Sequence, residues 1–111
     1  LPEVDYLITE STYGNRLHSK EDVIDELAEV VNETHKRRGV LIIPAFAVGR
    51  AQSLMHYLWV LKKQKRIPDM PMYLNSPMAT NVNRLMCKYM DLHRLSEPEC
   101  MGTCDVVDYV R

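Results

Sequence analysis

The side chains with the clearest chemical potential lie in a short loop near the start of the chain. Glu10, Thr12 and Tyr13 follow the apolar run 5–9, which has the composition of a short strand. A carboxylate at the end of a strand can act as a general base, bind a metal ion or orient a histidine. Polar groups just beyond the carboxyl ends of strands form the ligand sites of open α/β proteins. The alternative for this loop taken alone is a tight turn.

Two further apolar runs also end in unusual loops. Residues 40–43 lead to a glycine and Arg50 at the start of a predicted helix, and residues 72–74 lead to Ser76. Free N–H groups and a guanidinium at a helix N-terminus can bind an anion. The alternative to an anion site is a structural ion pair between Arg50 and a nearby acid such as Glu10. Neither a Gly-x-x-x-x-Gly-Lys-Ser/Thr motif nor a Gly-x-Gly-x-x-Gly motif is present, so we do not expect a nucleotide-cradling loop.

Hydrophobic spacing predicts three amphipathic helices between and after these strands. They are expected at 19–38, at about 48–65 and at 78–90. Ser19 is the expected N-cap of the first helix, and Gly39 is its expected left-handed stop.

The alternation of strand and helix predicts an α/β fold, with a three-layer, mostly parallel sheet flanked by helices. Ser76 or Asn75 is expected to cap the third helix, with Pro77 at its first position. In the tail, we expect Pro98 to break any helix, and residues 104–110 fit either a short strand or a helical turn.

The size and charge of the chain are those of one small globular domain. A formal net charge of −1 over 111 residues does not indicate a dedicated polyanion-binding protein. The basic clusters at 36–38 and 62–66 fall at predicted helix C-termini, where cations favour the macrodipole. No apolar run reaches the ~20 residues that span a membrane. The chain starts without a signal core or an initiator methionine, so we expect a piece of a longer protein.

The three cysteines, Cys87, Cys100 and Cys104, lack the spacing of a disulfide framework. An odd count of this kind predicts a reducing compartment, and we expect a cytoplasmic protein with reduced structural thiols. Cys100 and Cys104 can share a helix face near His93, but a metal site there needs two more good ligands.

Three segments of the chain carry motifs in a characteristic order. They are ESTYG at 10–14 followed by RLH at 16–18, VLIIPAFAVGRAQ at 40–52, and YLNSPMA at 73–79. Together they resemble the β-CASP branch of the metallo-β-lactamase superfamily, which includes ribonuclease J and the nuclease subunit of the cleavage and polyadenylation factor. The resemblance covers about residues 1–90.

The resemblance implies a zinc-dependent phosphodiesterase, an exo- or endoribonuclease that acts on RNA, or on DNA in some branches. In this family two metal ions activate the attacking water, and nucleic acid enters a cleft between the catalytic domain and the inserted β-CASP cap. The resemblance makes Glu10 a catalytic residue that orients a histidine from a later motif. Thr12, Tyr13, Arg50 and Ser76 then line the nucleic-acid cleft, and we expect Glu10 and Arg50 to face each other across it.

The resemblance also implies a division of the chain. Residues 1–16 correspond to the end of a metallo-β-lactamase strand with the first β-CASP motif, and residues 17–111 to the first part of the β-CASP domain. The zinc ligands of the family lie outside both ranges, so we expect this chain to bind no catalytic zinc and to cleave nothing by itself. Its expected partners are RNA, the remainder of the metallo-β-lactamase domain and, through an exposed Met-rich and aromatic face, a second copy.

Two other functions fit the same residues. One is a non-catalytic binding or scaffold module of the same descent. The other is an unrelated α/β domain that binds a small phosphorylated ligand at the loops 44–50 and 75–80.

Overall fold

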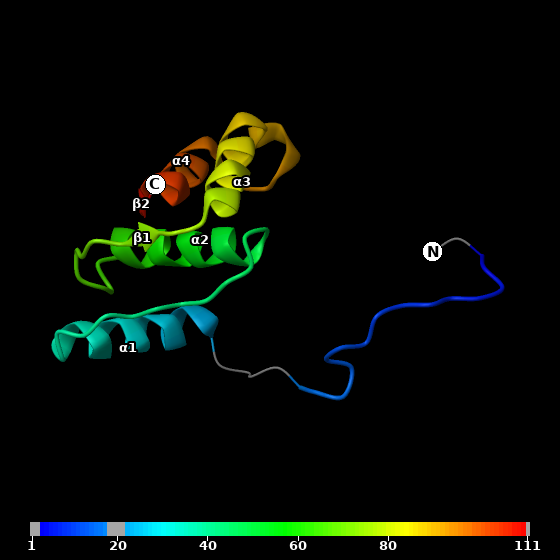
Figure 1. Cartoon of the computed structure of the whole chain (residues 1–111), viewed down its shortest axis with the longest axis horizontal. Coiled ribbons are helices and arrows are strands. Elements are labelled where there is room, and N and C mark those ends of the chain that lie inside the picture. The colour runs from blue at the N-terminus through cyan, green and yellow to red at the C-terminus, as the bar shows by residue number, and fades with distance from the viewer. Residues whose placement is uncertain (1–2, 18–21, 111) are drawn as a thin grey trace.

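A computed structural model describes residues 3–17 and 22–110 of the chain. The described residues form a helical body in which α2 lies between α1 on one side and the pair α3 and α4 on the other (Figure 1). Residues 3–17 run away from this body as an extended segment (Figure 1). The elements are α1 (Val23–Lys36), α2 (Arg50–Lys63), β1 (Tyr73–Leu74), α3 (Pro77–Lys88), a short 3-10 helix (Met90–Leu92), α4 (Glu97–Asp105) and β2 (Asp108–Tyr109).

Helix α1 confirms the first predicted helix but has different ends. Its N-cap is Asp22, whose carboxylate accepts a hydrogen bond from the Ile24 N–H at 2.8 Å. The expected cap, Ser19, lies outside the described residues. At the other end Arg38 adopts the left-handed conformation, with φ 53°, and the N–H of Gly39 donates to the Thr34 carbonyl at 2.9 Å. The left-handed stop is therefore Arg38 and not Gly39.

Two of the three predicted strands are absent from the described residues. Segments 5–9 and 40–43 are extended, but neither has a neighbouring strand in that part of the chain. Val40 and Ile42 are 84% and 82% exposed, and only Leu41 packs against the core. An extended apolar segment forms a buried strand only where a neighbouring strand pairs with its backbone groups, and the described residues supply no such neighbour. The expected three-layer arrangement is accordingly not confirmed by the described residues, which form helices and one small parallel sheet.

The third predicted strand is present and pairs with the tail. Strand β1 lies parallel to β2, with Tyr73 opposite Asp108 and Leu74 opposite Tyr109. The parallel direction confirms that part of the prediction, because a helical crossover between neighbouring strands gives parallel pairing.

The tail contains a helix that was not predicted. Pro98 is the second residue of α4, where the missing N–H breaks no helical hydrogen bond, so the proline does not prevent the helix. The Glu99 carboxylate accepts from the Ser96 N–H at 2.8 Å and from its hydroxyl at 2.6 Å, which completes the N-terminal cap. Residues 104–110 then provide both the end of this helix and strand β2.

The apolar core lies between α1 and α2, and a second contact joins α2 to α4. The first core centres on Val31 and Leu61, which are 2% and 0% exposed. In the second contact, Gly102 lies so close to the Trp59 indole that a Cβ at this position would collide with the ring. The His56 ring nitrogen Nδ1 also lies 3.1 Å from the Thr103 hydroxyl. Helix α2 is thus the element around which the body is assembled.

The cysteines are not all reduced. Cys87 of α3 and Cys104 of α4 form a disulfide, and Cys100 is a buried free thiol. The expectation of three reduced thiols is therefore wrong for this structure, because packing α3 against α4 brings these side chains together. No helix among the described residues has the length and apolar character to cross a membrane.

Candidate functional site

The first candidate loop is a tight turn that fixes the backbone around Glu10. The Thr12 N–H donates to the Glu10 carboxylate at 2.9 Å, and the Gly14 N–H donates to the Ser11 carbonyl at 3.0 Å. The backbone hydrogen bond from Thr12, together with one from its side chain, holds the pKa of Glu10 below its ordinary value. Tyr13 is 61% exposed, with the Arg16 guanidinium 5.8 Å from the centre of its ring. Glu10 is thereby kept as an exposed carboxylate.

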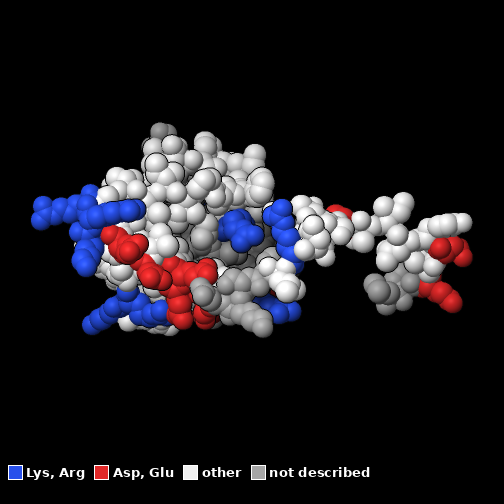
Figure 2. Space-filling view, turned by 90° about the horizontal axis from the view of Figure 1, so that it is seen from below, with Lys and Arg blue, Asp and Glu red and all other residues white. Residues whose placement is uncertain are grey.

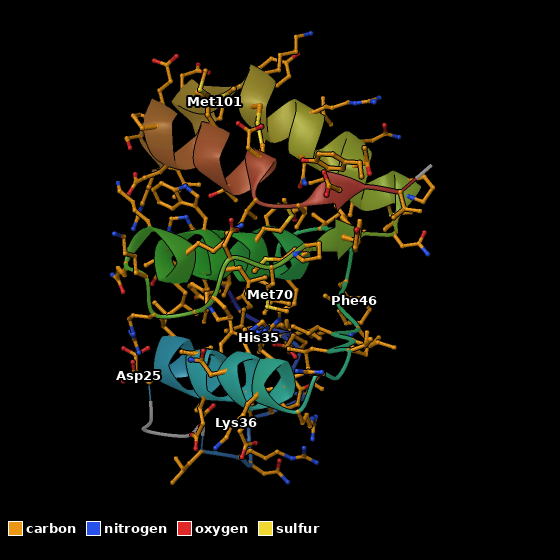
Figure 3. The ribbon with its side chains drawn as sticks, turned by 90° about the vertical axis from the view of Figure 1, so that its left-hand side faces the viewer. Asp25, His35, Lys36, Phe46, Met70 and Met101 are labelled. Carbon is orange, nitrogen blue, oxygen red and sulfur yellow. A yellow bond between two sulfur atoms is a disulfide. The ribbon has the colours of Figure 1, made fainter. Side chains whose placement is uncertain are left out.

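The second candidate loop wraps tightly around the start of α2. Gly49 has φ 80°, a conformation that favours glycine. The N–H groups of Arg50 and Ala51 donate to the carbonyls of Val48 and Phe46, each at 3.1 Å. Those two N–H groups are therefore engaged within the chain and are not free for an anion. Phe46 itself stands at the edge of the body (Figure 3), 86% exposed.

Arg50 keeps an exposed guanidinium at this position. Among residues 3–17 and 22–110 it forms no ion pair with Glu10, so the structural alternative proposed from the sequence is not found there. An anion at this loop would depend on the side chain of Arg50 rather than on the helix N-terminus.

A buried pair of amides holds this loop in place. The Gln52 side chain accepts from the Gly49 N–H at 2.7 Å and donates to the Ala47 carbonyl at 3.1 Å. It also donates to the Asn83 side-chain oxygen at 2.7 Å, and Asn83 in turn donates to the Tyr109 hydroxyl at 3.3 Å. The network links the loop before α2 with α3 and β2, and so it sets where Arg50 begins its helix.

The third candidate loop places Ser76 as the N-cap of α3, with Pro77 next, as predicted. The Ser76 hydroxyl accepts from the Ala79 N–H at 3.2 Å, and its carbonyl accepts from the Thr80 hydroxyl at 2.9 Å. Ser76 therefore has a structural role in this chain, and its hydroxyl is half-buried at the start of the helix.

The basic cluster at 62–66 is partly neutralised by acids of the same chain. The Arg66 guanidinium lies 2.6 Å from the Asp25 carboxylate, and the Lys62 ammonium lies 2.7 Å from that of Asp69. Figure 2 shows many of the basic side chains gathered at the end of the body opposite the extended segment, next to acidic ones. These pairs are largely exposed and contribute little to stability, but they favour the interpretation of the cluster at 62–66 as a helix end rather than as a nucleic-acid surface.

The structure does not bring the predicted site residues together. Glu10, Thr12 and Tyr13 lie on the extended segment, whereas Arg50 and Ser76 lie on the helical body (Figure 1). The expected groove between Glu10 and Arg50 is not formed by the described residues, because the extended segment has no packing partner there. A hollow of about 620 Å³ lies instead beside α3 and the tail, where none of these five residues lines it. His18, which belongs to the first motif, lies outside the described residues.

Sequence reasoning missed the network of Gln52 and Asn83. The signal was available: each amide occupies a position on the otherwise apolar, buried side of its helix. A buried amide is retained in a fold when its hydrogen-bonding groups find partners.

Comparisons with known proteins give the family. The model of the Beta-Casp domain matches residues 51–111. Ribonuclease TTHA0252 of Thermus thermophilus is 38% identical over 82 residues, which are 73% of this chain and 19% of that protein. Transcription termination factor FttA of Methanosarcina mazei is 37% identical over 101 residues, or 85% of this chain and 16% of that protein. Probable RNase MJ4 of Methanocaldococcus jannaschii is 38% identical over 96 residues, which are 86% of this chain and 21% of that protein.

The family match covers more than half of the chain, so the chain belongs to the β-CASP branch of the metallo-β-lactamase superfamily. The chain spans about a fifth of the length of these curated relatives. No solved structure matches it.

Proposed function

We propose that this chain is part of a zinc-dependent nuclease of RNA processing or degradation, in which it helps to hold nucleic acid over the metal site. The match of residues 51–111 to the β-CASP domain is the observation that carries this proposal. Relatives that match most of the chain are named as ribonucleases, and each of them is about five times as long as the matched region. The activity would therefore belong to a longer protein.

The exposed apolar surface supports the division of the chain at about residue 16. Tyr6, Leu7 and Ile8 are 91%, 75% and 97% exposed, although consecutive apolar residues of this kind are typical of a strand buried on both faces. The accessible surface of 9489 Å² also exceeds the roughly 6,300 Å² expected of a compact chain of this mass. We infer that residues 1–16 join the sheet of the metallo-β-lactamase domain, and that 17–111 form the first part of the cap.

The described residues around Glu10 do not fit a zinc site. Within residues 3–17 and 22–110, three or more side chains that could bind one metal ion come together only at Cys87, Cys100 and Cys104. Glu10 does not belong to this cluster. The zinc of the proposed enzyme would have to be held by side chains from elsewhere in the protein.

Glu10 and Arg50 have separate roles in the proposed reaction. The Glu10 carboxylate, kept ionised by its hydrogen bonds to Thr12, accepts a hydrogen bond from a histidine supplied by a later part of the protein. The oriented imidazolium then donates its proton to the leaving oxygen of the RNA. Arg50 neutralises a backbone phosphate, since its guanidinium is exposed and has no ion pair among the described residues. The hydroxyls of Thr12, Tyr13 and Ser76 line the same cleft.

RNA cleavage by the full-length protein with zinc, compared with cleavage by the 111-residue chain, tests the proposal. We expect the full-length protein to hydrolyse RNA and the chain alone to show no turnover. Binding of RNA by the full-length protein without any cleavage would support the scaffold function instead. Turnover by the chain alone, lost on Glu10→Gln, would contradict the proposed division of labour.

A further inference from the structure

Three sulfur atoms and an imidazole converge where α3 meets α4. Cys87 lies on α3, and Cys100 and Cys104 lie one turn apart on α4. The three Sγ atoms all lie within 4.8 Å of one another. His93, from the connection between the two helices, places Nε2 at 3.6 Å from the Cys100 Sγ.

The two separations measured from the Cys100 Sγ are those of a tetrahedral metal site, whereas His93 is not within 4.8 Å of all three sulfurs and must move to complete the set. With Zn–S bonds of about 2.3 Å and a Zn–N bond of about 2.05 Å, a tetrahedral ion sets its ligands about 3.8 Å apart for S···S and about 3.6 Å for S···N. The Cys100 Sγ lies 3.8 Å from the Cys87 Sγ and 3.6 Å from His93 Nε2. The closer pair, Cys87 and Cys104, is the one joined as a disulfide.

The surroundings of the cluster are also those of a binding site. Cys100 and Cys104 are 0% and 8% exposed, so the sulfur atoms are largely removed from water. His93 Nδ1 is buried and has no hydrogen-bond partner among the described residues, while Nε2 lies 3.1 Å from the Met86 carbonyl. An orphaned buried nitrogen shows that this imidazole is not held here by a complete hydrogen-bond network. The hollow of about 620 Å³ is lined by both Cys87 and Cys104, which gives an ion a route to the sulfurs.

We propose that the reduced chain binds one zinc ion through the Sγ atoms of Cys87, Cys100 and Cys104 and through Nε2 of His93. Four protein ligands leave no open position, which is the arrangement of a structural zinc site. Reduction of the Cys87–Cys104 disulfide takes two electrons from an added phosphine, which becomes a phosphine oxide, and two protons from water, and it yields two thiols. Zinc then displaces the thiol protons, and His93 Nε2 gives up its contact with Met86 to reach the ion.

Cys100 is the free thiol of the cluster, and burial raises its pKa above its ordinary value. The proposed zinc ion and the disulfide both connect α3 with α4, so each would stabilise the packing of these two helices.

Titration of the chain with Co²⁺, in the presence of a phosphine reductant, tests the site. We expect one Co²⁺ per chain, with thiolate-to-cobalt charge-transfer bands in the near ultraviolet and the intense visible bands of tetrahedral cobalt. Zinc should displace the cobalt and abolish these bands. Far-ultraviolet circular dichroism of each variant establishes that the helices are retained.

The ligand set is tested by paired substitutions. Cys87→Ser should weaken cobalt binding at least about 100-fold and reduce the charge-transfer absorption. His93→Gln should shift the visible bands, whereas His35→Gln, on the exposed face of α1, should leave both affinity and spectrum unchanged. Weak octahedral spectra, or folded Cys87→Ser and His93→Gln variants that bind cobalt as the unaltered chain does, would overturn the proposal.

Discussion

The Gln52 side-chain amide donates a 2.7 Å hydrogen bond to the Asn83 side-chain oxygen in the interior of the helical body. The two residues are 9% and 2% exposed and come from α2 and α3. From this pair, hydrogen bonds continue to Gly49 on one side and to Tyr109 on the other. These hydrogen bonds connect the loop that precedes Arg50 with the small parallel sheet, and so they hold the two in a defined relative position.

Replacing Gln52 by alanine tests the contribution of this network. Gln52→Ala removes three hydrogen bonds and leaves the Asn83 amide buried with one partner fewer. Because an unsatisfied buried polar group carries its full desolvation cost, we expect a loss of about 2–4 kcal/mol in the free energy of unfolding. Urea unfolding followed by the fluorescence of Trp59, the single tryptophan, measures it. The control is Gln64→Ala at the exposed C-cap of α2, and equal midpoints for the two variants would contradict the role of the network.

The contact between Gly102 and Trp59 predicts a reversal of the usual effect of a helical glycine. Gly→Ala within a helix ordinarily stabilises by about 1 kcal/mol. Here the added Cβ would collide with the indole, and overpacking costs about 1–3 kcal/mol. We expect Gly102→Ala to lower the unfolding free energy and to shift the emission of Trp59 to longer wavelength as the ring is displaced. Gly39→Ala serves as the control, because a Cβ at Gly39 would meet only the side chains of Arg37 and Thr34. A higher unfolding free energy for Gly102→Ala would contradict the prediction, since it would show that the indole moves without cost.

The cap of α4 predicts a component of acid sensitivity. Hydrogen bonds from the Ser96 hydroxyl, and then from its N–H, lower the pKa of Glu99 from its ordinary value of 4.5. A carboxyl whose pKa is lowered on folding stabilises the fold above its unfolded pKa, and this stability is lost as the pH falls through the folded value. We therefore expect Glu99→Gln to lower the melting temperature at about pH 7 and to have a much smaller effect at about pH 3.

A matched variant of the same turn separates this effect from net charge. Glu97→Gln removes the same charge from the first turn of α4. If its melting temperature followed that of Glu99→Gln at every pH, the hydrogen bonds to Ser96 would not be the cause.

Arg50 and Arg66 provide a comparison of one proposed phosphate contact with one structural ion pair. In the full-length protein, we expect Arg50→Ala to weaken binding of single-stranded RNA about tenfold or more and to reduce the slope of log K against log salt by about 0.7. Arg66→Ala should leave both unchanged, because that guanidinium is paired with Asp25. Fluorescence anisotropy at several salt concentrations measures both quantities, and equal losses for the two variants would remove the specific role of Arg50.

The sequence predicted the helices better than the sheet, for physical reasons. The apolar spacing within α1, α2 and α3 is local, so a single chain reveals it. Strand pairing depends on partners elsewhere, and segments 5–9 and 40–43 have the composition of strands without a partner among the described residues. Helix α4 is not expected from the sequence because a proline within a helix breaks it, whereas Pro98 occupies the second position of the helix, where proline is well tolerated.

The local structure at the candidate residues follows the motifs, whereas their role in a common site stays a prediction. The turn at Glu10, the start of α2 at Arg50 and the cap at Ser76 all occur where the motifs placed them. Their separation in space could not be predicted from local sequence, because it depends on what covers residues 3–17.

The most direct test of the nuclease proposal is single-turnover cleavage of RNA by the full-length protein carrying Glu10→Gln, compared with Glu3→Gln on the same extended segment. Because Glu10 is proposed to orient the proton donor, we expect its substitution to lower the cleavage rate by about 10²–10⁴-fold while RNA affinity is retained. Glu3→Gln should cleave at the unaltered rate. Equal cleavage rates for the two variants would contradict the proposed role of Glu10.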